Sequence, residues 1–153
     1  MKSLDIILGE RPTPPENTPK SPVALELEDM GRKVAGAIAT RNWDDPVFDH
    51  FAPNFKAYIE HSDVPVAKSV KEYQEVYNAI AAAHPDYSNE VLSINADVDE
   101  KRGRASVWVL MRVYGHPKGT VRESVTVAHL ERKEGIWLFT RQHGIRGINQ
   151  MGD

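Results

Sequence analysis

Apolar and polar residues follow a helical period in two stretches of the first half of the chain. From Val23 onward, apolar residues recur every three or four positions, with charged residues between them. A second such stretch, KSVKEYQEVYNAIAAAH, spans residues 68–84. Ser69 followed by Glu72 is a capping-box pattern that predicts where this helix begins, and Pro85 predicts where it ends.

The segment between these helices predicts shorter elements. The sequence NWDDPVFDHFAP is typical of a turn followed by one short helix, which we expect to end at Pro53. Residues 55–61, FKAYIEH, predict a short strand, after which SDVPVA turns the chain back.

After the second helix the period becomes two, which is the signature of β-strands. We expect strands at 88–99, 104–115, 120–132 and 136–146, because the turn sequences DEKRG, GHPKG and RKEG separate them. Helices followed by an antiparallel meander predict an α+β fold, with the helices packed on one face of a curved sheet.

The last predicted hairpin suggests which side chains share a face. If KEG is a three-residue loop with Gly135 in the left-handed conformation, His129 lies opposite Phe139 and Val127 opposite Arg141. The face that results contains Glu123, Val125, Val127 and His129 together with Trp137, Phe139, Arg141 and His143. Aromatic and ionisable groups mixed on the helix-facing side of a sheet are typical of a small-ligand cavity.

The preceding hairpin is compatible with two registers. With GHPKG as a five-residue loop, Arg112 lies opposite Arg122 and Glu123 faces the row that contains Val107. With HPKG as a four-residue loop, Arg112 lies opposite Glu123, on the same side as Trp108. A slip of one residue exchanges the two faces, so the sequence leaves both alternatives open.

The strand at 104–115 is apolar on both sides, whereas a sheet with water on one face alternates more cleanly. Cover on the second face, most simply from another copy of the chain, would explain this pattern. We therefore expect a homodimer formed through the sheet.

The length of 153 residues suits one domain, with distinct segments at both ends. Five of the ten prolines lie in residues 1–22. Because proline fixes φ and removes a backbone donor, we expect an extended arm there, either disordered or lying on the domain or on a second subunit. The domain itself is expected at residues 23–147, followed by a tail at 148–153.

Composition and charge exclude several classes of function. The formal net charge is -3 and there is no cysteine, so neither nucleic-acid binding nor disulfide or thiolate chemistry is expected. No apolar run approaches the length of a membrane helix, and LDIIL near the start is too short for a signal peptide. We expect a soluble cytoplasmic protein. The six histidines lack metal-binding spacing and no nucleotide-binding loop is present, so neither a metal nor a cofactor is expected.

Three stretches carry a family resemblance: AIATRNWDDPVFDHFAPNFKAYI, SVKEYQEVYNAIAAAHPDYSNEVLSINADVDEKRGRASVWVLM and RESVTVAHLERKEGIWLFTRQHGIRG. In their order of elements they resemble the nuclear transport factor 2-like superfamily. They are most similar to its SnoaL-like branch of polyketide cyclases, particularly to uncharacterised fungal members. The resemblance covers about residues 24–147, but its motifs are diffuse. It implies a cone-shaped α+β fold around a deep pocket, often dimeric and cofactor-independent, that hosts cyclases, dehydratases and isomerases.

The candidate catalytic residues are His143, Glu123 and Arg141. An imidazole can take or give a proton near neutral pH, so we expect His143 to be the general acid or base. Glu123 would be its partner, and Arg141 would stabilise an enolate. The structural alternatives are a histidine at a solvent-exposed strand end and an Arg141–Glu123 ion pair that braces the sheet.

The candidate substrate-binding residues are Tyr58, His61, Tyr73, Tyr77, Trp108, Arg112, His129, Trp137 and Phe139. The resemblance implies that Tyr58 and His61 lie at a pocket mouth, although His61 could equally be an exposed turn residue. Tyr73 and Tyr77 lie four residues apart on one helix face, where core packing would also account for them.

These observations predict a small cofactor-independent enzyme of the SnoaL-like type. It would catalyse cyclisation, isomerisation or dehydration of a hydrophobic oxygenated metabolite. The alternatives are a non-catalytic ligand-binding or dimeric assembly module of the same fold, and a structural dimer whose aromatic residues fill the cone. They differ in whether ionisable groups with perturbed pKa values converge in the pocket.

Overall fold

The computed structural model describes residues 19–59 and 64–149, with side chains described as far as Gly144. Its elements are α2 (Pro22–Thr40), the 3-10 helix η1 (Pro46–His50), β1 (Phe51–Ile59), α3 (Val70–Ala83), β2 (Ser88–Asp99), β3 (Arg104–Tyr114), β4 (Val121–Lys133) and β5 (Ile136–Asn149). The predicted arm up to residue 18, the candidate His61 and the tail from residue 150 lie outside the described residues. None of the described helices is long and apolar enough to cross a membrane.

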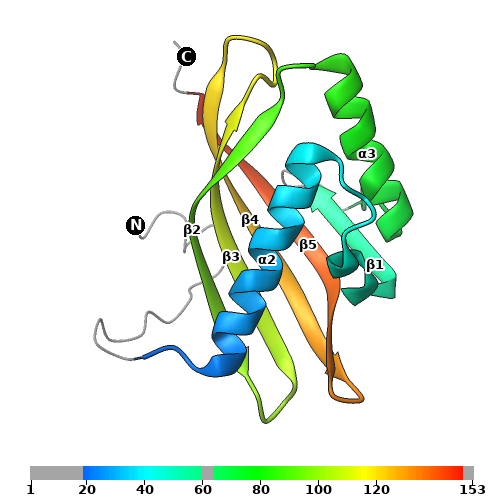
Figure 1. Ribbon diagram of the computed structural model, residues 1–153, viewed down its shortest axis with the longest axis vertical. Coiled ribbons are helices and arrows are strands. Elements are labelled where there is room, and N and C mark those ends of the chain that lie inside the picture. The colour runs from blue at the N-terminus through cyan, green and yellow to red at the C-terminus, as the bar shows by residue number, and fades with distance from the viewer. Residues whose placement is uncertain (1–18, 60–63, 150–153) are drawn as a thin grey trace.

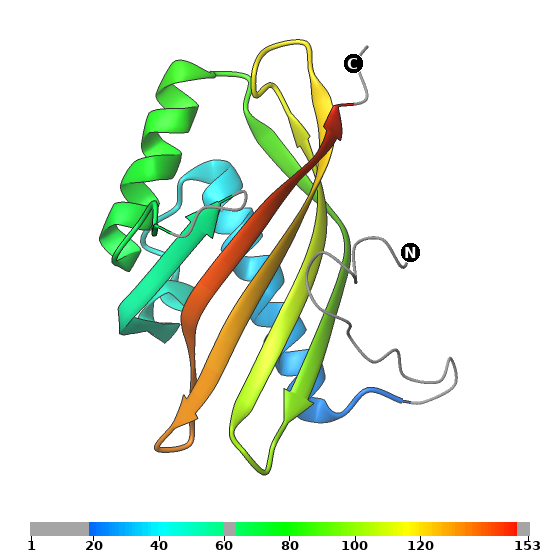
Figure 2. The ribbon, with the colours of Figure 1, turned by 180° about the vertical axis from the view of Figure 1, so that it is seen from behind.

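The strands form a single five-stranded sheet in the order β1-β5-β4-β3-β2. β1 runs parallel to β5, and the other neighbours are antiparallel. The helix α2 packs on β2 and β3, and α3 packs on β1, so both helices cover the same face (Figure 1). Seen from behind, the opposite face carries no described helix (Figure 2). We call the helix-covered side the inner face and the other side the outer face. The predicted α+β architecture is confirmed.

Both long helices begin at serine caps. The Ser21 hydroxyl accepts a hydrogen bond from the Ala24 N–H at 3.1 Å, and α2 ends at Arg41, which has the left-handed conformation (φ 52°). The Ser69 hydroxyl accepts from the Glu72 N–H at 3.1 Å, as the sequence predicted. The Glu72 carboxylate in turn accepts from the Lys68 N–H at 3.1 Å, so the side chains of Ser69 and Glu72 each bind one backbone donor at the start of α3.

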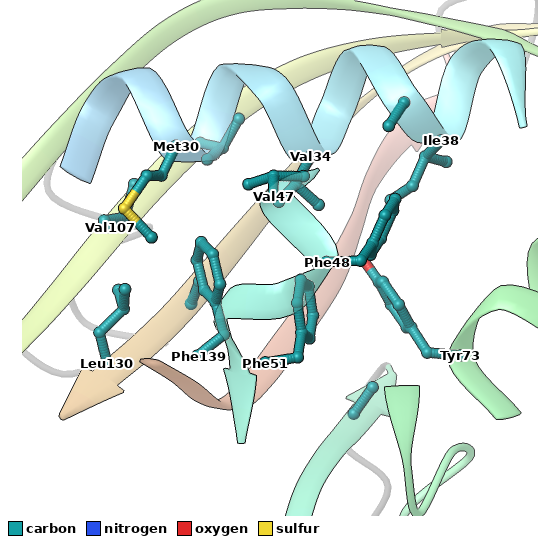
Figure 3. Close-up of a cluster of buried hydrophobic side chains, with 14 of the residues drawn as sticks. Met30, Val34, Ile38, Val47, Phe48, Phe51, Tyr73, Val107, Leu130 and Phe139 are labelled. Carbon is teal, nitrogen blue, oxygen red and sulfur yellow. The ribbon is translucent and has the colours of Figure 1, made fainter. Parts of the chain in front are cut away.

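The core lies between α2 and the inner face (Figure 3). Met30, Val34 and Ile38 extend from the helix into a buried cluster that also contains Val107 and Phe139 of the sheet. Burying each such side chain contributes roughly 1.5–3 kcal/mol to folding, so this layer dominates the stability of the domain. A cluster of aromatic rings from η1, β1, α3 and β5 closes the far end of the core.

The first strand differs from the prediction because it begins earlier. β1 starts at Phe51 and runs through Pro53, whereas the sequence predicted a strand at 55–61 and a helix that ended at Pro53. The helix η1 already ends at His50. Proline is tolerated because β1 is an edge strand, and the register of β1 against β5 shifts between Phe51 and Lys56.

The hairpin of β3 and β4 has the register that the four-residue loop predicted. Arg112 lies opposite Glu123, and the Gly115 N–H donates to the Thr120 carbonyl at 3.2 Å. Because Val107 and its alternate neighbours belong to the inner core, Trp108 and Arg112 lie on the outer face.

The hairpin of β4 and β5 contradicts the predicted register. The sequence predicted a three-residue loop with Arg132 opposite Ile136. Glu134 and Gly135, with φ of 52° and 82°, instead form a two-residue turn, and Lys133 lies opposite Ile136. Two successive positive φ values are characteristic of a type I′ turn, whose twist matches the strands. Because of this shorter turn, Phe139 pairs with Leu130 of β4 and not with His129, the partner predicted from the sequence.

A β-bulge at Thr140 then shifts the register a second time. Phe139 pairs with Leu130, whereas His129 pairs with Arg141, so Thr140 is the extra residue. Its hydroxyl donates to the His129 carbonyl at 3.2 Å. The predicted mixed face is therefore wrong in part. Trp137 and Phe139 belong to the inner core, whereas Glu123, Val125, Val127 and His129 share the outer face with Arg141 and His143.

Candidate ligand-binding site

Two adjoining cavities lie between the inner face and the helices, and we call them together the chamber. The deep lobe, of about 50 Å³, is walled mainly by apolar side chains of α2 and the sheet, such as Val34, Val107 and Phe139. The polar lobe, of about 100 Å³, lies toward the β3–β4 loop. Both lobes are lined by Tyr77, Tyr87, Met111, Thr126 and Gln142.

Tyrosines from α3 and from the turn after it form one wall of the chamber. Tyr73 and Tyr77 lie one helical turn apart, with ring centroids 5.2 Å from each other, and Tyr87 lies 6.2 Å from Tyr77. The Tyr73 hydroxyl donates a buried hydrogen bond of 2.8 Å to the Oε1 atom of Gln142. The bulge places Gln142 on the inner face, so this contact depends on the irregularity of β5.

The three phenols remain protonated at neutral pH. Burial raises the pKa of Tyr73 well above its ordinary value, and burial also raises the pKa of Tyr77. Burial raises the pKa of Tyr87 as well, against the opposing effects of a hydrogen bond with Asn89 and the charge of Arg122. A neutral phenol has one hydrogen to donate, and that of Tyr73 is already bound to Gln142, so Tyr77 and Tyr87 are the phenols of this wall that can donate to a bound molecule.

The polar lobe contains a buried arginine. Arg122 of β4 is only 6% exposed. Its guanidinium donates to the His116 carbonyl and, at 2.9 Å, to the Nδ1 atom of the same residue. Since Nδ1 accepts, the neutral imidazole of His116 carries its hydrogen on Nε2. The ring of His84, at the end of α3, packs 4.6 Å from that of His116.

Most of the sequence-predicted candidates lie on the outer face. Tyr58 stacks on His143 across β1 and β5, with centroids 4.9 Å apart and 9° between the rings. His129 lies edge-on to His143 at 5.8 Å, and its Nδ1 atom is 3.2 Å from the Ser106 hydroxyl. Arg141 lies opposite His129 across β4 and β5.

Both outer-face histidines are neutral at neutral pH. Burial and the charge of Arg141 lower the pKa of His129 to about 4. The same two causes lower the pKa of His143. His129 and Arg141 line a polar groove of about 640 Å³, together with Asp97, Asp99 and Arg104. The groove therefore mixes charges of both signs.

Glu123 lies apart from the two residues with which the sequence grouped it. Its carboxylate forms an ion pair of 3.5 Å with Arg112, whose guanidinium also lies 3.9 Å from Glu90. On β4, Glu123 lies four residues from Val127, the partner of His143, which corresponds to about 13 Å along the strand. The structure thus brings together Tyr58, His129, Arg141 and His143, but not Glu123.

Three of the predicted binding residues, Tyr73, Tyr77 and Phe139, line the chamber. Trp137 lies in the inner core beneath the guanidinium of Arg132, which is 5.4 Å from its ring, and Trp108 lies on the outer face. Sequence reasoning missed several lining residues: Tyr87, Asn89, His116, Arg122, Thr126 and Gln142. For Arg122 a signal existed, because the four-residue loop register places it opposite the apolar Val113.

Within the described part of the chain, no three His, Asp or Glu side chains are grouped so that they could hold a metal ion. The chemistry of the chamber is instead that of hydrogen-bond donors. Phenols, amides, hydroxyls and one guanidinium surround an otherwise apolar space, which is an arrangement that orients a ligand and polarises its oxygen atoms.

Comparison with known proteins identifies the fold. No family model matches the sequence, and no curated protein sequence is significantly similar to it. A proposed scytalone dehydratase from Novosphingobium aromaticivorans is similar in structure, with a TM-score of 0.61 and 14% identity, over 83% of this chain and 85% of that one. A proposed ketosteroid isomerase from Shewanella frigidimarina gives a TM-score of 0.59 and 16% identity, over 76% and 91%.

A further similar structure is an NTF2-like protein of unknown function from Pseudomonas putida, with a TM-score of 0.58 and 16% identity, over 80% of this chain and 85% of that one. At such identities the likeness concerns the fold, because one fold carries many activities. The chain has the α+β fold of NTF2-like proteins, in which helices cover one face of a mostly antiparallel sheet.

Proposed function

We propose that the chain is a small cofactor-independent enzyme that promotes proton transfer in an oxygenated ring compound bound in the chamber. Isomerisation, dehydration and cyclisation belong to this class of reaction. The observation that carries the proposal is the buried Tyr73–Gln142 hydrogen bond beside an open cavity that Tyr77 and Tyr87 also line. The resemblance of the sequence to SnoaL-like enzymes, and two neighbours proposed to be a dehydratase and an isomerase, support it.

The size of the chamber favours a single-ring ligand. Its lobes of about 50 and 100 Å³ together approach the volume of a protein cavity that holds benzene, roughly 150 Å³. A fused polycyclic compound requires several hundred Å³. The hydrophobic metabolite expected from the sequence is therefore proposed to be monocyclic.

The donors define the proposed chemistry. When a proton leaves the carbon next to a carbonyl group, negative charge develops on the carbonyl oxygen. Neutral phenols and the Nε2–H group of His116 stabilise such an oxygen by donating hydrogen bonds. No Asp or Glu is among the described residues that line the lobes. In this proposal a water molecule takes the proton from the α-carbon, and solvent returns a proton to a carbon of the resulting enolate.

Exchange of hydrogen for deuterium tests the proposal without knowledge of the natural substrate. Cyclohexanones and cyclohex-3-enone are incubated with the protein in D₂O, and the loss of the α-proton signals and the appearance of the conjugated enone are followed by NMR. We expect exchange above the buffer rate, reduced at least tenfold in Tyr77→Phe. Tyr114→Phe is the matched control, since the Tyr114 hydroxyl bonds to the exposed Glu90 on the outer face.

The same experiment distinguishes the proposed enzyme from a second candidate function, that of a ligand-binding module without catalysis. The absence of a carboxylate from the described chamber lining favours this alternative, because most proton-transfer sites include a base. Ring compounds that bind and stabilise the protein, yet exchange no faster than in buffer, would establish a binding module and exclude the enzyme.

A further inference from the structure

The polar lobe and the deep lobe of the chamber differ in charge as well as in polarity. Arg122 is the one formal cation among the described residues that line either lobe, and it lies at the polar end. The deep lobe, by contrast, is walled chiefly by aliphatic and aromatic groups. The chamber therefore has an apolar end and a cationic end.

We propose that the ligand of the chamber carries a carboxylate group and that Arg122 binds it. This inference rests on the proposed function and adds the chemical class of the ligand, a monocyclic carboxylic acid. The ligand occupies both lobes: its apolar edge is directed toward the deep lobe, and its carboxylate lies in the polar lobe beside the β3–β4 loop.

The arrangement of β4 supports the binding of an anion at this end. Arg122, Ser124 and Thr126 occupy successive inner-face positions of the strand and all line the polar lobe. The guanidinium supplies a charge-assisted hydrogen bond, and the two hydroxyls add neutral donors within one or two strand positions. Gln142, on the neighbouring strand, lines the same lobe and adds an amide.

The surroundings of Arg122 also favour an anion over a neutral group. The guanidinium is almost fully buried, so its attraction is weakened by water and salt much less than that of a surface arginine. It already acts on Tyr87, whose pKa its charge lowers against the larger effect of burial.

The polar groove lined by His129 and Arg141, which we call the outer groove, is less suited to an anion than the chamber. Arg104 and Arg141 line it, but Asp97, Asp99 and Glu131 lie among them. An anion entering that groove meets both signs of charge at an open surface. The chamber is thus the better anion site, although it is several times smaller.

Matched pairs of ligands test the inference on the complete chain. Binding of benzoate and benzamide, and of phenylacetate and phenylacetamide, is measured by titration calorimetry at pH 7. The members of each pair have almost the same shape and differ in charge. We expect each carboxylate to bind at least tenfold more tightly than its amide, and this preference to be lost in Arg122→Gln. Arg104→Gln, a change in the outer groove, is expected to keep the preference.

A second variant keeps the test decisive if Arg122→Gln does not fold. Ser124→Asp places a carboxylate beside Arg122, so it should abolish benzoate binding and retain benzamide binding. Amides that bind as tightly as carboxylates would overturn the inference and leave the proposed function standing. A preference that survives in both Arg122→Gln and Ser124→Asp would also overturn it. Failure of all four ligands to bind would refute the chamber as a ring-binding site, and the proposed function with it.

Discussion

The hydroxyl of Tyr73 on α3 donates a 2.8 Å hydrogen bond to the side-chain amide of Gln142 on β5, and both residues are buried. Helix and sheet thus meet through a polar contact at the boundary of the chamber. When a buried acceptor loses its donor, the folded protein loses more free energy than the hydrogen bond had contributed, because water cannot reach the acceptor to replace the donor.

Removal of the Tyr73 hydroxyl should therefore destabilise the protein. We expect Tyr73→Phe to lower the free energy of unfolding by about 1–2 kcal/mol in urea denaturation. The control is Tyr114→Phe, in which an exposed hydrogen bond of 3.1 Å to Glu90 is lost and the change should stay within about 0.5 kcal/mol. Equal effects of the two substitutions would contradict the importance of the buried contact.

Glu28 provides a second test, at the opposite edge of the sheet. Its carboxylate, on α2, is 2% exposed, accepts from the Ala96 N–H of edge strand β2 at 3.1 Å, and lies 2.9 Å from the Lys20 ammonium. Glu28→Ala leaves that N–H without its acceptor, so we expect a loss of about 2–3 kcal/mol on thermal or urea unfolding.

The neighbouring residue provides the matched control for Glu28. Asp29 forms an exposed ion pair of 3.0 Å with Lys33, and Asp29→Ala should change the free energy of unfolding by less than about 0.5 kcal/mol. Glu28→Gln retains an acceptor for the backbone and should fall between the two. A Glu28→Ala protein as stable as Asp29→Ala would show that the carboxylate does not anchor α2 to β2.

Two glycines of the β3–β4 loop should respond differently to the same substitution. Gly115 has φ of 72°, and a Cβ atom there would lie 2.3 Å from the Asp86 carbonyl oxygen. Gly119 has φ of 82° and open space around it. Gly119→Ala should therefore cost about 1 kcal/mol, for the backbone conformation alone. Gly115→Ala should cost at least about 3 kcal/mol, because the backbone must also move. Comparable melting temperatures would disprove the close approach at Asp86.

The stability of the protein should depend on the protonation of His129. Its pKa is about 4 in the folded protein, against an ordinary value of 6.5 in the unfolded chain. Between these values the unfolded chain takes up a proton and the folded protein does not, so stability falls as the pH drops from 7 toward 4. Below pH 4 this group causes no further loss, because both states are protonated.

The non-titrating variant His129→Gln isolates this contribution. We expect the loss of unfolding free energy between pH 7 and pH 4 to be smaller in His129→Gln by about 1–2 kcal/mol, allowing for the partial exposure of the ring. Urea denaturation at both pH values gives the comparison, and carboxylates that titrate in the same range affect both proteins alike. Identical pH dependence of the two proteins would mean that the His129 imidazole is protonated as readily in the folded protein as in the unfolded chain.

The sequence predicted the elements whose signals are local. Ser69 and Glu72 identified the start of α3, and alternation identified all four long strands, because both patterns depend on neighbours within a few residues. Pro53 misled the prediction of β1, since proline argues against a strand unless the strand lies at an edge, and that is a property of the whole sheet.

The site was harder to predict because it depends on register. One extra residue at Thr140 decides that Gln142, and not Arg141 or His143, faces the helices. Nothing in the alternation of residues 136–146 marks that position. Tyr87 was missed for a different reason: it belongs to a turn, and the turn reaches the chamber only through the packing of α3 on the sheet.

The bulge has a consequence for how the chain can change in length. Thr140 and Arg141 together oppose His129, so deletion of Thr140 would restore regular pairing and leave each side chain of β5 on its present face. Deletion of His143 would instead exchange the two faces for the remainder of the strand. Length variation among descendants of this chain should therefore concentrate at Thr140, the one position in this part of β5 where loss of a residue preserves the division between chamber and outer surface.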